Sequence, residues 1–323
     1  MANVKRVYQI NGEGMKKAIV TGATGFIGYN LVKVLKEENI EIIALVRKNS
    51  KSVEKLCDEK IRVVECDMLD YKDLSSLIID RDIDCVFHTA WQGVSDSDAR
   101  NSDIQIKNVR YTLDLIESMQ LIGIKTLVGC GSIHEQEAIV EMEENRVSGN
   151  LGLMYKTAKT AAHWMGKAKC GSNGIRFFWP LINTYGEGER SARLINTVIR
   201  KIYNGEKPSL SSGKQYYDFV HVSDVARALY LIGDRGVDGT NYVITSGNAK
   251  PLKLFLKEVG HIANEVNGGT QIPLGFGEKT DNVISLPKKI FKDKKLKIDT
   301  GFEPKVSFEE GIRRTAIWIK SNQ

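Results

Sequence analysis

The 323-residue sequence lacks the features of membrane-spanning, secreted and fibrous proteins. No stretch reaches the ~18 consecutive apolar residues of a transmembrane helix. The first residues lack the apolar core of a secretory signal. Only 6 prolines accompany 29 glycines, which excludes collagen-like and proline-rich disordered chains. We therefore expect a cytoplasmic protein with no membrane partner.

Cysteine and one-sided charge are also scarce. The five cysteines are scattered and never stand in CxxC spacing, so we expect reduced, buried thiols and no metal site. The 46 basic and 40 acidic residues leave a net charge of +6 without any Arg/Lys block. This mild surplus fits an anionic small-molecule substrate, and we predict no nucleic-acid partner.

What the sequence does contain is a 42% hydrophobic share, enough for a sizeable core, and a regular alternation of two patterns. Short β-branched runs predict strands at 17–21, 40–46, 61–66, 84–90, 125–130 and 175–180. Helical spacing predicts helices at 26–38, 52–59, 73–78, 103–120 and 150–170. Apolar strands separated by helices predict an α/β fold with a Rossmann-type, doubly wound parallel sheet.

Beyond Pro180 the alternation stops, and short helices mix with brief strands such as the run 240–245. Helices are expected there at 192–205, 222–232, 252–266 and 307–320. We predict an NAD(P)-binding Rossmann domain over 15–182 and a smaller mixed α/β substrate-binding lobe over 183–323. The lobe is expected to interleave with the last strands. Residues 1–14 are interpreted as an N-terminal extension without a catalytic role.

The turn between the first strand and the first helix reads TGATGFIG, Thr21 to Gly28, and predicts a dinucleotide site. Glycine permits a tight turn and a close backbone approach, while a helix N-terminus presents free N–H groups to a pyrophosphate. The residues expected to bind the cofactor here are Gly22, Thr24, Gly25, Phe26, Ile27 and Gly28.

The end of the second strand indicates which dinucleotide binds. An acid there would bind the ribose 2′-hydroxyl of NAD, but the sequence has Arg47 and Lys48 and no acid. Both can pair with a 2′-phosphate, so NADP(H) is favoured, with NAD(H) as the alternative. A plainer interpretation is that Arg47 and Lys48 are solvated surface charges without a cofactor contact. Asp67, after the third strand, either accepts from an adenine amine or caps the next helix.

Tyr155 and Lys159 stand four residues apart in a helical pattern, which places both on one helix face. A free phenol has a pKa of ~10, and a nearby cation is expected to lower it toward a value useful for proton transfer. Ser132 follows the fifth strand, where its hydroxyl can reach the same carbonyl oxygen as Tyr155. These three residues are the predicted catalytic set.

Together these motifs resemble the extended short-chain dehydrogenase/reductase family, in its branch of nucleotide-sugar epimerases, dehydratases and 4-ketoreductases. The resemblance runs from Met15 nearly to the C-terminus, and it includes the tail GFEPKVSFEEGI. The other matching segments are His88-Thr89-Ala90, Asn183 to Gly188, and Asp218 to Val225. It implies that Ser132 orients a sugar carbonyl, that Tyr155 is the acid/base, and that Lys159 also holds the nicotinamide ribose.

The resemblance also implies further contacts. Cofactor contacts beyond the glycine turn are expected from Arg47, Asp67, Met68, Thr89, Ala90, Tyr155, Lys159 and Pro180. Substrate contacts are expected from Trp91, His134, Asn183, Arg193 and Tyr217. The partners implied are a nucleotide-sugar substrate and a second copy of the chain in a homodimer.

Three departures from the family pattern bear on the reaction. The dehydratase branch has an Asp-Glu pair after its catalytic hydroxyl residue, whereas this chain has Ile133-His134, which argues against 4,6-dehydration. The usual Val-Tyr-Gly that follows reads Glu135-Gln136-Glu137. Tyr217 replaces an Arg that often binds the substrate pyrophosphate. Phosphate contacts are therefore expected from Arg190, Arg193 or Lys214.

The leading prediction is NADPH-dependent reduction of the 4-keto group of a nucleotide-activated sugar. The alternative is an NAD-dependent nucleotide-sugar 4-epimerase. A non-catalytic dinucleotide-sensing protein on the same fold is the third reading, and the intact Ser132, Tyr155 and Lys159 argue against it. His88, His163 and His221 are expected to be structural.

Overall fold

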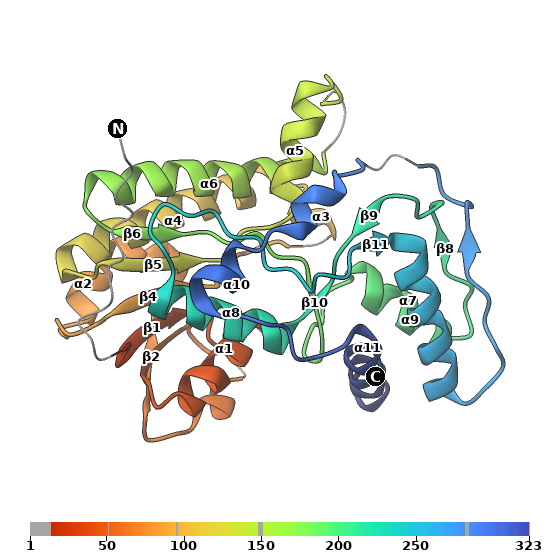
Figure 1. The fold of residues 1–323 in the computed structure, drawn as a ribbon. Helices are drawn as coiled ribbons and strands as arrows, with labels where there is room; N and C mark the ends of the chain where they lie inside the picture. Colours follow the sequence, from red (N-terminus) through yellow and green to blue (C-terminus); the bar gives the residue numbers. More distant parts are fainter. Residues whose placement is uncertain (1–13, 51, 95, 148–150, 282–283, 323) are drawn as a thin grey trace.

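A six-stranded parallel sheet forms the centre of the computed structural model, which describes residues 14–50, 52–94, 96–147, 151–281 and 284–322 (Figure 1). Its strands lie in the order β3-β2-β1-β4-β5-β6. They are β1 (Lys17–Thr21), β2 (Glu41–Val46), β3 (Ile61–Glu65), β4 (Cys85–His88), β5 (Thr126–Gly129) and β6 (Arg176–Phe178). This is the strand order of a Rossmann fold, so the predicted fold class is confirmed.

Alternating residues of each strand face two different helix layers. Ala18 and Val20 of β1 pack in one core with α1 (Phe26–Glu37) and α8 (Val222–Arg235). Ile19 packs in the other with α4 (Ser102–Ile122) and α6 (Leu153–Ser172). Burial on both faces is the reason these strands read as continuous apolar runs. The predicted start of α6 at Asn150 lies outside the described residues.

Short helical elements complete this half: η1 (Val53–Leu56), η2 (Met68–Asp73), α2 (Leu74–Leu77), α3 (Asp96–Ala99) and α5 (His134–Glu143). The helix predicted at 52–59 is a short 3-10 turn. The sequence does not indicate α5, because this segment is rich in glutamate and its apolar residues show little helical periodicity.

The second half is built on three helices, α7 (Leu194–Tyr203), α9 (Leu252–Asn267) and α11 (Phe308–Ser321), which share one core. Three strand pairs accompany them: β7 (Thr184–Tyr185) with β10 (Val220–His221), β9 (Tyr216–Tyr217) with β11 (Lys250–Pro251), and β8 (Ser209–Leu210) with β12 (Gly275–Phe276). Two short elements, η3 (Lys288–Lys292) and α10 (Lys295–Thr300), lead into α11.

The strand predicted at 240–245 is wrong, because only one residue of that run forms a β-bridge, between Val243 and Leu181. The Leu181 backbone pairs with Tyr242 and Ile244, but two residues later Asn183 already accepts from the Val220 backbone. The chain after β6 therefore changes partner before a ladder can grow.

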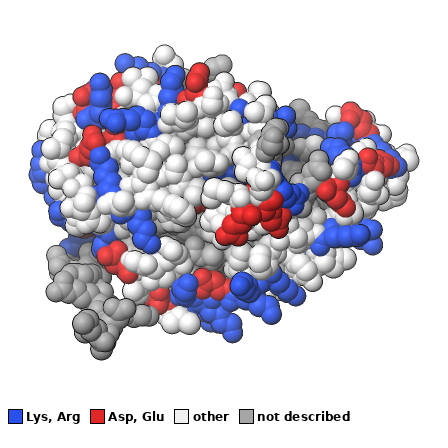
Figure 2. Space-filling view, turned by 90° about the horizontal axis from the view of Figure 1, so that it is seen from above, with Lys and Arg blue, Asp and Glu red and all other residues white. Residues whose placement is uncertain are grey.

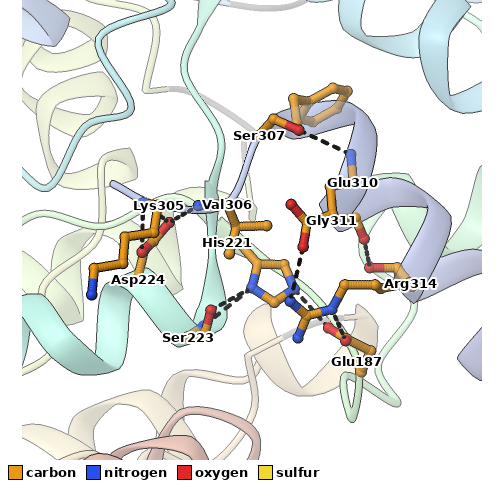
Figure 3. A network of polar contacts seen from close by, with 12 residues as sticks. Glu187, His221, Ser223, Asp224, Lys305, Val306, Ser307, Glu310, Gly311 and Arg314 are labelled. Atoms are coloured by element: carbon orange, nitrogen blue, oxygen red, sulfur yellow. Dashed lines mark hydrogen bonds and ion pairs between the residues drawn. The ribbon is translucent and has the colours of Figure 1, made fainter. Parts of the chain in front are cut away.

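Helix α8 belongs to the second half by sequence but covers the sheet, and a polar network ties α11 to it (Figure 3). Asp224 of α8 accepts from the backbone nitrogens of Lys305 and Val306, each at 2.9 Å. Glu187 bridges His221 and Arg314, at 2.6 Å each. These contacts join the two halves of the chain, while the boundary at residue 182 and the interleaving of the lobe with the last strands stay predictions.

Of the five cysteines, Cys57 is exposed and the other four are buried. Within the described ranges, no helix has both the length and the apolar character needed to cross a bilayer. The same ranges contain no group of three or more His, Cys, Asp or Glu side chains placed to hold a metal ion.

Candidate active site

At two glycines of the turn around the start of α1, the structure leaves no room for a side chain. Gly22 has a φ of +65°, and a Cβ atom there would lie 2.9 Å from the Ala90 nitrogen. A Cβ on Gly28 would lie 2.2 Å from the Gly22 oxygen. Gly25 is the N-cap of α1, which has no side-chain cap and no acid in its first turn among the described residues. The free N–H groups of α1 therefore fit a dinucleotide pyrophosphate.

Hydrogen bonds fasten the end of β4 to this turn. The Thr89 hydroxyl donates to the Thr21 carbonyl at 2.7 Å, and the Ala90 nitrogen donates to the Thr21 hydroxyl at 3.2 Å. His88 lies between the hydroxyls of Thr21 and Thr112, and burial lowers its pKa to about 3. His88 is therefore a neutral, structural residue, as predicted.

The basic end of β2 lies beside the glycine turn. Arg47 and Lys48 are exposed, and the nearby Ser50 hydroxyl donates to Thr24 Oγ1 at 3.3 Å. Asp67 occupies the N-cap position of η2 but makes no side-chain capping hydrogen bond, so the capping interpretation is wrong. The contact of Asp67 with adenine stays a prediction. The cofactor contacts of Met68 and Pro180 also stay predictions, and the Pro180 carbonyl accepts from the Gly131 backbone nitrogen at 3.0 Å.

The predicted catalytic residues come together at the carboxyl end of β5. Ser132 lies close enough to Tyr155 of α6 to influence the pKa of its phenol. One turn further along α6, the Lys159 ammonium donates to the Cys130 carbonyl at 2.9 Å and lies 3.6 Å from the centre of the Trp91 ring. Lys159 is buried, and burial lowers its pKa to about 8.

One expectation about this set is wrong. Burial raises the pKa of Tyr155, and the Arg193 charge and the Ser132 hydroxyl act against this rise. The cation that acts against the rise is Arg193, while the Lys159 ammonium donates to the Cys130 carbonyl and lies against the Trp91 ring. Tyr155 is consequently a protonated phenol at neutral pH.

A cavity of about 360 Å³ opens beside Tyr155 and is lined from both halves of the chain. Four of the five predicted substrate residues line it: His134, Asn183, Arg193 and Tyr217. The fifth, Trp91, instead stands edge-on to Tyr155 with ring centres 6.3 Å apart. Arg193 lies 3.3 Å from Glu189, which also lines the cavity.

Arg190 and Lys214, the other two phosphate-binding candidates, are not among the described residues that line the cavity. Both are exposed. Arg193 is thus the candidate cation that the fold brings to the cavity.

The buried carboxylate of Glu135 holds the backbone of Ser132 in place. Glu135 accepts from the Ser132 backbone nitrogen at 2.8 Å and from the Trp179 indole at 3.1 Å. Its second oxygen lies 2.9 Å from Nδ1 of His163. Glu135 therefore fixes the backbone that presents the Ser132 hydroxyl.

A second buried carboxylate, Glu137, lies under the cavity wall. Nδ1 of His134 is 2.8 Å away, Lys156 Nζ is 2.9 Å away, and the Tyr217 hydroxyl donates at 3.1 Å. Burial alone would raise the pKa of Glu137, but His134 and Lys156 outweigh it and hold the pKa at about 2. Lys156 also pairs with the buried Glu141 at 3.1 Å.

These carboxylates and Lys156 were missed as functional candidates. A usable signal was present, since Glu135 and Glu137 occupy the place of an apolar residue and a glycine in the family pattern. The three-residue spacing of His134 and Glu137 also places them on one face of a helix.

A doubly wound dinucleotide-binding fold, with Ser132, Tyr155 and Lys159 gathered at the carboxyl edge of its sheet, defines an enzyme of the extended short-chain dehydrogenase/reductase class. The model of the NAD dependent epimerase/dehydratase family matches residues 18–245, and the chain belongs to this family. The family resemblance and the prediction of an NAD(P)-dependent enzyme are thereby confirmed.

Relatives of known description span nearly the whole chain. A UDP-glucuronate 4-epimerase of Thermodesulfobacterium geofontis is 26% identical over 94% of this chain and 96% of its own. A dTDP-glucose 4,6-dehydratase of Mycobacterium tuberculosis is 25% identical over 95% and 94%. The structure of the Bordetella bronchiseptica enzyme WbmF with NADH has a TM-score of 0.74 at 22% identity, covering 95% and 92%. That last likeness shows the fold.

Proposed function

We propose that the protein is an NADP(H)-dependent reductase of the 4-keto group of a nucleotide-linked sugar. The observation that carries the proposal is the end of β2, where the exposed Arg47 and Lys48 lie beside the glycine turn and no acid stands in their place. Two cations suit a ribose 2′-phosphate, and the phosphate-tagged cofactor is the one that drives cellular reductions.

The protonation states in the cavity support the reductive direction. Bound NADPH would supply the hydride. Ser132 and Tyr155 hydrogen-bond the C4 oxygen, and Tyr155 gives its proton to that oxygen as it becomes an alkoxide. Because burial raises the pKa of Tyr155, the phenol holds the proton that a reduction consumes. Glu135 keeps Ser132 in place through its backbone nitrogen.

A nucleotide-sugar 4-epimerase is the second candidate, and the curated relatives favour it, since one of them is described as a UDP-glucuronate 4-epimerase. The same three residues serve that reaction, with Tyr155 first accepting a proton and then returning it. Dehydration is not proposed, because His134 stands where the dehydratase branch has an acid.

The two candidates differ in net cofactor use. The purified protein is mixed with NADPH or NADH and a TDP- or UDP-linked 4-keto-6-deoxyhexose, and absorbance at the reduced-nicotinamide band is followed. We expect one NADPH oxidised per ketone reduced, faster than with NADH. Interconversion of a 4-hydroxy nucleotide sugar and its epimer, with no net NADPH consumed and NAD retained on the protein, would contradict the reductase and establish the epimerase.

We also propose that the enzyme is a homodimer that pairs through α4 and α6. Leu121, Trp164 and Met165 of these helices are 50–68% exposed. The face seen from the α6 side has a broad area with few charged side chains (Figure 2). Light scattering should give twice the 36.1 kDa chain mass, and Trp164→Glu should halve it. Ile298→Glu, at an exposed site on α10, is the matched control. The cytoplasmic location stays a prediction.

A further inference from the structure

His134 is placed for more than a passive contact with substrate. It is the first residue of α5, two residues after Ser132, and its side chain is 38% exposed in the wall of the cavity that Tyr155 also lines. Nδ1 of its ring lies 2.8 Å from Glu137, so Nε2 is the ring nitrogen left for a ligand. A hydrogen bond at Nδ1 fixes the tautomer and orientation of an imidazole.

The carboxylate that holds this ring is itself held from two other directions. Glu137 is 5% exposed, and it binds Lys156 of α6 at 2.9 Å and the Tyr217 hydroxyl of β9 at 3.1 Å. Burying a carboxylate costs free energy unless it is fully paired. Elements from both halves of the chain thus converge on the group that orients His134.

The second histidine–carboxylate pair of the site shows what a purely structural pair looks like here. His163 lies 2.9 Å from Glu135, but its side chain is only 13% exposed. Its ring stacks on Trp179 at 6.2 Å and packs against Phe177 at 6.1 Å. It is not among the described residues that line the cavity, whereas His134 is. The two pairs therefore differ in access to a ligand.

We propose that His134, oriented by Glu137, is a catalytic acid/base that moves a proton on a sugar carbon next to the C4 carbonyl. The inference rests on the proposed function, because its substrate is the same nucleotide-linked 4-keto sugar. Hydrogens on a carbon beside a ketone are acidic, since the charge left behind moves to the carbonyl oxygen. Ser132 and Tyr155 are the groups that would hydrogen-bond that oxygen.

The step balances without any oxidant or reductant. Nε2 of His134 takes the proton, the electron pair of the C–H bond forms a carbon–carbon double bond, and the carbonyl electron pair moves onto oxygen. Return of a proton from the imidazolium re-forms the ketone. Because the imidazolium exchanges its proton with water, the net result is exchange of a carbon-bound hydrogen with solvent.

The test is deuterium exchange in the absence of nicotinamide. The full-length protein is incubated in D₂O with a TDP- or UDP-linked 4-keto-6-deoxyhexose, and mass spectrometry and proton NMR report deuterium at carbons 3 and 5. We expect exchange above the protein-free rate. His134→Asn should lower it ~10²–10⁴-fold, the usual contribution of general acid–base catalysis.

Controls separate lost chemistry from lost structure. His261→Asn changes an exposed histidine of α9 and should exchange like the wild type. His134→Ala should recover exchange when free imidazole is added, which a merely structural role would not predict. Glu137→Gln, the positioning variant, should lower exchange less than His134→Asn. Thermal melting of each variant establishes that it is folded.

The outcomes distinguish this inference from the proposed function. Wild-type protein that reduces the ketone without catalysing exchange contradicts the inference alone. The same holds if folded His134→Asn exchanges at the wild-type rate. Exchange without NADPH oxidation supports His134 and contradicts the reductase. If neither reaction occurs, the proposed function is wrong and the inference falls with it.

Discussion

The two ends of the active site are built from different chemical groups. The coenzyme end, residues 21–28 with 89–90, is made of backbone groups and glycines packed so closely that a Cβ on Gly28 would lie 2.2 Å from a carbonyl oxygen. The substrate end, residues 131–141 with 155–159, buries the ionisable side chains of Glu135, Glu137 and Lys159. A pyrophosphate needs only N–H groups, whereas proton transfer needs titratable groups held at fixed positions.

The difference also predicts which kind of substitution impairs each end. Shape limits the coenzyme end, so an added methyl group should damage it without any change in charge. Proton transfer limits the substrate end, so removal of the phenolic oxygen of Tyr155 should lower turnover while the fold persists. The four predictions below test this contrast from the largest expected effect to the smallest.

Removal of one oxygen at the substrate end should have the largest effect. Tyr155→Phe keeps the ring against Trp91 but removes the proton donor, so turnover should fall ~10²–10⁴-fold. Binding of NADP(H), measured by fluorescence titration, should change little. Tyr203→Phe removes a hydroxyl from α7, away from the cavity lining, and is the control. Unchanged turnover in Tyr155→Phe would mean that its phenol takes no part in the reaction.

Two charges, Arg47 and Lys48, lie beside the coenzyme end, and reversing the first should change cofactor choice. Arg47→Asp exchanges a 2′-phosphate partner for a 2′-hydroxyl partner, so NAD(H) should bind more tightly than NADP(H). A charge-assisted contact contributes about 1.5–3 kcal/mol, on the order of tenfold to a hundredfold in affinity. Lys60→Asp makes a similar charge change at an exposed position before β3. Equal affinity of the wild type for both cofactors would remove the basis of the proposed NADPH dependence.

A matched pair of glycines tests the steric limit. Gly28→Ala must displace backbone, which costs about 1–3 kcal/mol of folding free energy, and NADP(H) affinity should fall with it. Gly171→Ala lies in α6, where a Cβ would meet no atom within 4 Å. Alanine is favoured over glycine in a helix by about 0.5–1 kcal/mol, so this variant should be more stable. Denaturant unfolding checks both signs, and a Gly28→Ala variant as stable as wild type would contradict the steric account.

The Glu187 network shows that a charge cluster can also be structural, and its effect is the smallest. Burial would raise the pKa of Glu187, but hydrogen bonds from His221 and Arg314 hold it at about 2, below the ordinary 4.5. The depressed value stabilises the fold above pH 4.5, and the gain is lost as pH falls toward 2.

We therefore expect Glu187→Gln to lower stability by about 1–2 kcal/mol at pH 7, and by less as the pH falls toward 2. Thermal melting across this pH range measures the difference. Glu265→Gln, in the exposed pair with Arg313, should change stability little at any pH. A constant gap between wild type and Glu187→Gln would show that ionisation of Glu187 does not stabilise the fold.

The sequence by itself determined the coenzyme end. The strands around β1, the helix that starts at Phe26 and the glycines between them follow from local rules: apolar runs, helical spacing and the geometry of a tight turn. The spacing of Tyr155 and Lys159 on one helix face was local information of the same kind.

Only the tertiary structure decided the substrate end. Which way the Lys159 ammonium points depends on the Cys130 carbonyl and the Trp91 ring, which come from other elements of the sheet edge. Glu137 would be taken for a surface glutamate from the sequence, but in the fold Lys156 and Tyr217 bind it. The physical reason is that a buried charge is stable only with partners, and these partners are distant in sequence. The local pattern of the sequence therefore does not reveal these partners.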